Sequence, residues 1–215
     1  MGLLLFLLTF VSVKSQVIVT FTEPKRMDAK EFTPVTIYTK SDSIVKGYGF
    51  LSAINYSSHA VRFIPSKPSK KIIEQVSWTS FYAEDLIKVE IEYKSKILKL
   101  FPVKPKSNGF GIGATHLYHK IYENNSVKLF CHVYGIPFIN KKKCAYLVLK
   151  NGEEKAGQIV MKLSDKPKKM PERAGNFFDD CPKLQNKIKA GEYQKSLKGL
   201  ISILDFYDIS CQKHN

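Results

Sequence analysis

Arginine is scarce in this sequence. Only three of the 34 basic residues are arginine, namely Arg26, Arg62 and Arg173, and all the others are lysine. Lysine lacks the planar guanidinium group that contacts guanine edges or phosphate through two parallel hydrogen bonds. The composition therefore argues against sequence-specific recognition of nucleic acid.

The sequence also lacks the short motifs of common catalytic and cofactor sites. It has no GxSxG nucleophile elbow, no HExxH or paired CxxC metal motif, and no motif of paired carboxylates. Gly109, Gly111 and Gly113 form the run GFGIG, but its spacing and context differ from a dinucleotide-binding fingerprint. We therefore predict no catalytic residue and no cofactor. A non-enzymatic role is favoured over the alternative, a hydrolase whose catalytic residues converge only in space.

Histidine offers one weak metal-binding pattern. His116 and His119 are three residues apart, in a segment at 115–122 that we interpret as a short helix, although a strand fits nearly as well. On a helix the two imidazoles would share a face and could hold zinc together with a third ligand. No further ligand motif supports this, so we favour ordinary surface or core histidines and predict no metal.

Long apolar runs are confined to the first residues of the chain. Residues 2–13 are apolar apart from Thr9 and Ser12. A run this short suits a secretory signal peptide better than a membrane span, and we expect cleavage after Ser15. An uncleaved membrane anchor is the alternative, because no lysine or arginine precedes the run. No later stretch is apolar for long enough to form a transmembrane helix.

What the sequence does contain is a folded composition with a large positive charge. It is 44% hydrophobic and 12% aromatic, and its net charge is +15. Such a surface attracts polyanions, so an anionic envelope component such as lipopolysaccharide, or an acidic polysaccharide, is one hypothesis for the partner. The lysines are scattered over predicted loops, which is also what a merely solvated surface would show.

The clearest structural element is a pair of strands near the middle of the chain. Residues 87–93 alternate apolar and charged side chains, which indicates a strand buried on one face. Residues 97–101 can fold back beside it, and Pro102 ends the run. Further β-prone runs lie at 17–21, 35–39, 44–51, 60–64, 72–82, 127–134, 143–150 and 158–163. Together they predict a mainly antiparallel sheet or a partly open barrel.

The C-terminal part changes to helical periodicity. Asp180 is the expected N-cap of a first helix, with Pro182 in its first turn and Gly191 past its end. A second helix has one apolar stripe, formed by Leu197, Leu200, Ile201, Leu204 and Tyr207. The predicted class is α+β, and the predicted layout is a signal peptide at 1–15, a β-rich domain at 16–163 and a helical segment at 164–215 that covers the sheet.

The four cysteines are candidates for disulfides in an exported chain. Four cysteines can pair in three ways, and we favour the pattern with bonds 131–144 and 181–211. Cys131 and Cys144 lie on consecutive predicted strands, whereas Cys181 and Cys211 bracket the two predicted helices. Closing the second loop of ~30 residues would contribute roughly 3 to 4 kcal/mol on the chain-entropy model. Four buried thiols are the alternative.

Several segments resemble a group of small exported proteins of Bacteroidetes, notably flavobacteria. They are YTKSDSIVKGY at 38–48, LVLKNGE at 147–153 and, above all, FFDDCPKLQNKIK at 177–189, followed by the aromatic pair at 206–207. The chain departs from the group at Asp208, where asparagine is usual. The resemblance implies a secreted or periplasmic protein and supplies no activity. We therefore expect an exported envelope protein that acts as a binding or interaction module.

Overall fold

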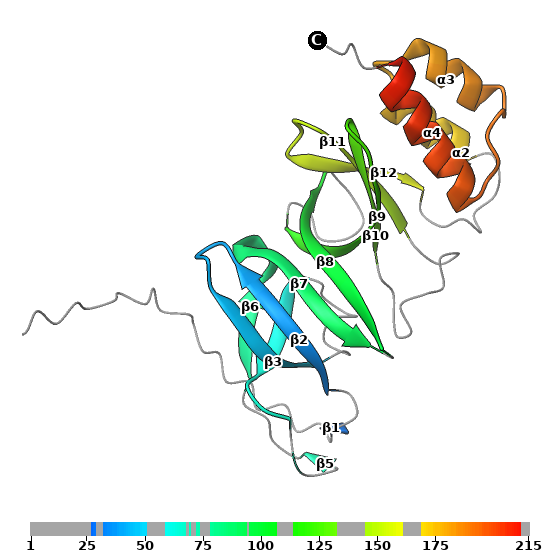
Figure 1. Cartoon of the computed structure of the whole chain (residues 1–215). Helices are drawn as coiled ribbons and strands as arrows, with labels where there is room; N and C mark the ends of the chain where they lie inside the picture. The colour runs from blue at the N-terminus through cyan, green and yellow to red at the C-terminus, as the bar shows by residue number, and fades with distance from the viewer. Residues whose placement is uncertain are drawn as a thin grey trace, which may run out of the picture.

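The computed structural model describes residues 27–28, 32–50, 59–67, 69, 72–73, 78–93, 95–106, 114–132, 145–160 and 169–211. Within these residues a ten-stranded sheet is accompanied by C-terminal helices that gather at one end of the molecule (Figure 1). The predicted α+β class, with the sheet dominant and mostly antiparallel, is confirmed. The expected leader and the predicted strand at 17–21 lie outside the described residues.

The strands are joined in the order β12-β11-β10-β9-β8-β7-β2-β3-β4-β6. Their bounds are β2 Phe32–Thr39, β3 Ile44–Phe50, β4 Ala60–Ile64, β6 Thr79–Tyr82, β7 Leu86–Tyr93, β8 Lys96–Pro105, β9 His116–Glu123, β10 Val127–His132, β11 Ala145–Lys150 and β12 Lys155–Val160. A separate two-stranded sheet joins β1 (Met27–Asp28) to β5 (Ile72–Ile73), and a short 3-10 helix, η2 (Ala83–Asp85), leads from β6 into β7.

The predicted central strand pair is present as β7 and β8. Val89 lies opposite Leu100, and Ile91 lies opposite Leu98. Val89 and Ile91 are fully buried, whereas Glu90 between them reaches solvent. The alternation of apolar and charged residues in β7 thus corresponds to one covered and one wet face.

Strand β8 contributes side chains to two different cores because successive residues point to opposite faces of a strand. Leu98 and Leu100 contact the first core, which also contains Val35, Ile37, Val61, Phe63, Phe81, Ala83, Leu86, Val89, Ile91 and Leu117. Phe101 and Val103 contact the second core, which also contains Tyr118, Phe130, Leu147 and Ala156. Figure 1 shows β8 running from the strands near the N-terminal half toward those near the helices.

The last strand returns to β8 through the one parallel pairing found among the described strands. Lys155 lies opposite Lys104, and Ala156 lies opposite Pro105. The amide of Lys106 extends this contact, since it donates a hydrogen bond to the carbonyl oxygen of Ala156 at 2.7 Å. The partly open barrel that the sequence also allowed is not established by these pairings.

The helix expected at 115–122 is wrong, and the segment is strand β9. It pairs with β8 on one side and with β10 on the other. Leu117 and Tyr118 are adjacent and both buried, at 2% and 1% exposure, because both faces of β9 are covered. Burial on both faces removes the alternation of polar and apolar residues that identifies a half-exposed strand.

Three helices follow the sheet: α2 (Lys169–Phe177), α3 (Pro182–Lys189) and α4 (Leu197–Ser210). The two predicted helices correspond to α3 and α4, whereas α2 has no counterpart among the predicted helices. The N-cap assignment at Asp180 is wrong, because Cys181 occupies the cap position and makes no side-chain cap bond. Ser196 caps α4 by accepting a hydrogen bond from the amide of Gly199.

The helices pack on one face of β10, β11 and β12. Their shared core contains Val127, Leu129, Cys131, Tyr146, Val148 and Ile159 from the strands, and Ala174, Phe178, Cys181, Leu184, Ile188, Leu200, Ile203, Leu204 and Tyr207 from the helices and the turn between α2 and α3. The second core lies on the opposite face of the same strands, where Phe130 and Leu147 point. The strands beneath the helices are therefore buried on both faces, and no helix in the described part of the chain is long and apolar enough to cross a bilayer.

The aromatic residues Trp78, Phe81 and Tyr82 are divided between the core and the surface. Trp78 and Phe81 are buried, at 3% and 6% exposure, and the guanidinium of Arg62 lies 4.5 Å from the centre of the Trp78 ring. Tyr82 is 40% exposed and lies near His59, with the two ring centroids 6.2 Å apart. Trp78 and Phe81 thus serve the fold rather than an exposed platform for a ligand.

A close approach of β12 and α2 depends on Gly157. A Cβ atom at this position would lie 2.2 Å from the ring of Phe177, whereas a Cβ at Gly175 in α2 would have no neighbour nearer than 3.7 Å. We therefore predict that Gly157→Ala lowers the free energy of unfolding by about 1–3 kcal/mol, the usual cost of overpacking.

The matched control is Gly175→Ala, which adds the same methyl group without a clash. It should leave stability unchanged or raise it by up to about 1 kcal/mol, since alanine favours helix over glycine. Urea unfolding of both variants measures the difference. Equal stability of Gly157→Ala and the wild type would show that α2 does not pack on β12 in this way.

Candidate binding surface

The described residues do not form the zinc site that the histidine pattern suggested. No group of three or more His, Cys, Asp or Glu side chains within them is placed to hold a metal ion. His116 and His119 belong to strand β9, and an odd separation on a strand directs two side chains to opposite faces. His119 instead has its Nδ1 atom 3.1 Å from the carbonyl oxygen of Lys99 on β8.

A shallow depression lies beside the turn that joins β7 to β8. It has a volume of about 380 Å³ and is lined by Pro34, Glu92, Ser95, Lys96 and Ile97. The lining holds one carboxylate and one amine, which is not the set of nucleophile, base and oxyanion donors that an acyl- or phosphoryl-transfer site needs. The depression is therefore not a candidate catalytic site.

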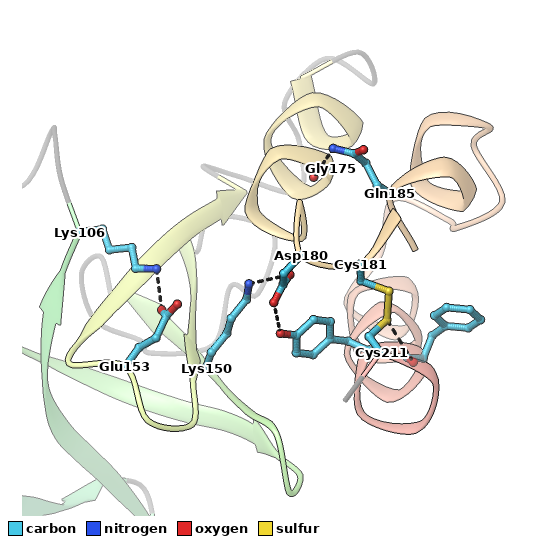
Figure 2. Close-up of polar contacts among 10 residues, drawn as sticks. Lys106, Lys150, Glu153, Gly175, Asp180, Cys181, Gln185 and Cys211 are labelled. Carbon is cyan, nitrogen blue, oxygen red and sulfur yellow. Dashed lines mark hydrogen bonds and ion pairs between the residues drawn. A yellow bond between two sulfur atoms is a disulfide. The ribbon is translucent and has the colours of Figure 1, made fainter. Parts of the chain in front are cut away.

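The polar contact that holds the helices to the sheet is formed by Lys150, Asp180 and Tyr207, which we call the sheet–helix clamp. The Nζ atom of Lys150, at the end of β11, lies 2.9 Å from Oδ1 of Asp180, which precedes α3 (Figure 2). The hydroxyl of Tyr207 on α4 donates a hydrogen bond to Oδ2 of the same carboxylate at 2.5 Å. One carboxylate thus connects a strand and two helical elements.

The surroundings of the clamp favour its charged form. The side chain of Lys150 is only 12% exposed, and its Nζ atom lies 4.9 Å from the centre of the Phe177 ring. Partial burial raises the pKa of Asp180, but the hydrogen bonds from Tyr207 and Lys150 outweigh burial and hold this pKa below its usual value. The carboxylate is therefore ionised at neutral pH.

A second set of contacts ties α4 to the turn between β9 and β10. The side chain of Asn124 accepts hydrogen bonds from the amides of Ser126 and Val127 and donates one to the carbonyl oxygen of Leu204 at 3.1 Å. The hydroxyls of Tyr122 and Ser126 donate to carboxylates of α4, at Asp205 and Asp208 respectively. These contacts fix the position of α4 against the end of β9 and the start of β10.

The disulfide predicted between Cys181 and Cys211 is confirmed. It joins the residue before α3 to the residue that ends α4, with the two Cα atoms 5.5 Å apart (Figure 2). Cys131 lies on strand β10, as the sequence predicted, and its side chain is buried. The other predicted bond, 131–144, involves Cys144, which lies outside the described residues.

These contacts use carboxylates on the side of the helices that faces the sheet. Elsewhere on the helical segment the charged side chains include exposed or half-exposed lysines: Lys183, Lys189, Lys195 and Lys198. Lys187 has its own carboxylate partner, Glu192, with 2.5 Å between Nζ and Oε2. Exposed carboxylates, at Glu172 and Asp179, share the outer surface of the helical segment with these lysines.

A second group of lysines lies where β8 meets β12. We call Lys104, Lys106 and Lys155 the lysine seam. Lys104 and Lys155 are register partners on adjacent strands and both are exposed. Lys106 has a carboxylate partner, since its Nζ atom lies 2.6 Å from Oε2 of Glu153. Among the described residues, the ion pairs do not include Lys104 or Lys155.

The clamp leads to a prediction about pH and stability. Lys150→Met removes the ammonium but keeps a long side chain, and should lower the free energy of unfolding at pH 7 by about 1–2 kcal/mol. Because the Asp180 pKa is depressed in the folded state, this loss should be complete above the unfolded pKa of about 3.9 and should shrink as pH falls further.

Lys187→Met is the matched control, because it removes an ion pair at the surface and should change stability much less than Lys150→Met does. Urea unfolding at pH 7 and pH 3 measures both variants. A loss in Lys150→Met that is the same at both pH values would contradict the assigned role of the Asp180 carboxylate.

The sheet–helix clamp stabilises the fold, and exposed lysines such as Lys104 and Lys155 lie at its surface. The chain matches no protein-family model, no curated protein and no solved structure. The resemblance to exported proteins of Bacteroidetes therefore stays a prediction from the sequence.

Proposed function

We propose that this protein is an exported, non-enzymatic binding module that holds an anionic envelope component or polysaccharide through its surface lysines. The observation that carries the proposal is the partition of charge. Lys106, Lys150 and Lys187 each have a carboxylate partner, whereas the exposed Lys104 and Lys155 at the β8–β12 pairing are in none of the ion pairs among the described residues.

Export is supported by the leader that the sequence predicts and by the Cys181–Cys211 disulfide. Disulfides persist in the periplasm and outside the cell, whereas thiols stay reduced in the cytosol. The bond also joins the start of α3 to the end of α4. A secreted or periplasmic location therefore fits both the chemistry of the chain and the proposed partner.

The type of basic side chain favours a polyanion as the partner over a nucleic acid that is recognised by its base sequence. Three arginines among 34 basic residues leave lysine as the main cation. Lysine acts as a mobile point charge, which suits a flexible chain with repeated phosphate, sulfate or carboxylate groups. The net charge of +15 adds long-range attraction that would speed the first encounter with such a chain.

The described side chains also fit a binding role better than a catalytic one. The depression beside the β7–β8 turn holds one carboxylate and one amine. The clamp is occupied by mutual hydrogen bonds among Lys150, Asp180 and Tyr207, so its groups serve packing. These observations favour electrostatic binding of a partner rather than catalysis on a bound substrate.

The test is retention of the purified protein on heparin and on immobilised lipopolysaccharide over a salt gradient. We expect affinity to fall by about 10- to 100-fold between 50 and 200 mM salt, because several counterions are released on binding. Neutral dextran is the control matrix. Absence of retention at 50 mM salt on both anionic matrices would sink the proposal.

The export part of the proposal has its own test. Protein collected from the periplasm or medium of the native cells should begin at Gln16, because signal peptidase is expected to cut after Ser15. Mass spectrometry of the intact protein measures this end. A cytosolic protein that keeps residues 1–15 would contradict export while leaving anion binding open to the salt test.

A further inference from the structure

The parallel pairing of β8 and β12 places two lysines side by side on one face. Val103 and Ala156, their neighbours in sequence, are buried in the second core, at 4% and 0% exposure. Because side chains alternate along a strand, Lys104 and Lys155 point away from that core. Paired strands lie roughly 4.8 Å apart, so the two side chains start as close neighbours.

This juxtaposition is unfavourable unless a negative charge lies between the two lysines. Like charges directly opposite each other on adjacent strands destabilise a sheet. Glu153 does not relieve the repulsion, because it already binds Lys106. Within the described part of the chain, the pair therefore has no ion-pair partner like Asp180 for Lys150 or Glu192 for Lys187.

The backbone that carries the pair is held in place from several sides. The Lys106 amide donates to the carbonyl oxygen of Ala156, and Gly157 lies directly beneath the ring of Phe177. The Nζ atom of Lys106 lies 5.5 Å from the centre of that same ring. A ligand that contacts both lysines would thus find their starting points already fixed, which lowers the entropy cost of binding.

The lysines of the helices are not forced together in this way. Lys187 and Lys189 lie in the last turn of α3, where cations stabilise the negative end of the helix dipole. Lys183 and Lys198 are single exposed positions on two different helices. Only for Lys104 and Lys155, among the described lysines, does the sheet register force two cations together without giving either an internal partner.

We infer that Lys104 and Lys155 form the anion-binding site of this protein and hold a sulfate or phosphate ester of an acidic polysaccharide between their two ammonium groups. Such a tetrahedral group has enough oxygen atoms to accept hydrogen bonds from both lysines at once. The inference rests on the proposed function, since it names the position at which the anionic partner is bound. It also links binding to the fold, because neutralising the pair would strengthen the contact of β12 with β8.

The test compares two double variants that remove equal charge. Lys104→Gln/Lys155→Gln should weaken binding of a heparin-derived oligosaccharide, which carries sulfate, and of a phosphorylated mannan by about tenfold or more. Lys183→Gln/Lys189→Gln should weaken it by no more than about threefold, through the loss of net charge alone. Titration calorimetry at fixed salt measures all three proteins, and a preference for one oligosaccharide identifies which ester is held.

Two readouts separate a binding role from a structural one. The seam variant should melt at the same temperature as the wild type or above it, since a repulsion is removed. In the wild type, the oligosaccharide should slow hydrogen exchange of the Lys106 amide, which spans the two strands.

The outcomes are distinct. Equal losses of affinity in the two double variants, or unchanged exchange at Lys106, would overturn the site at the seam while leaving polyanion binding standing. No binding of either oligosaccharide by the wild type would overturn the proposed function itself, and the inference with it.

Discussion

The fold depends on strand β8 (Lys96–Pro105) being paired along both of its edges. It joins β7 and β9 in the sheet, contributes residues of opposite parity to two cores, and receives β12 at its C-terminal end. A shift of β8 by one residue would exchange its two faces and move Leu98 and Leu100 out of the first core. The same register sets Lys104 against Lys155, so the packing of the interior decides what the surface presents there.

The helical segment shows how charge is divided between stability and the surface. The side chain of Lys150 is nearly buried and forms an ion pair with one oxygen of Asp180. The hydroxyl of Tyr207 donates a hydrogen bond to the second oxygen of that carboxylate. Acidic groups placed in such contacts are no longer available to neutralise lysines elsewhere. The ion pair of Lys150 thus holds the helices to the sheet, whereas Lys104 and Lys155 are in none of the ion pairs among the described residues, which is the physical basis for proposing an anionic partner.

Much of the secondary structure was predictable because local patterns carry it. The alternation in β7, the apolar stripe of α4 and the bracketing of two helices by Cys181 and Cys211 are all visible within short segments. The predictions failed where tertiary contacts override local pattern. Strand β9 is covered on both faces and so shows no alternation, and Cys181 occupies the cap position of α3 while Asp180 binds Lys150 and Tyr207.

The sequence by itself determined the α+β class, the mainly antiparallel pairing, the excess of lysine over arginine and one of the two predicted disulfides. Only the tertiary structure decided which carboxylates are occupied, that His116 and His119 point to opposite faces, and that Lys104 lies opposite Lys155. The reason is physical. Periodicity reports which face of an element is buried, whereas contacts between residues far apart in the chain depend on how several elements pack at once.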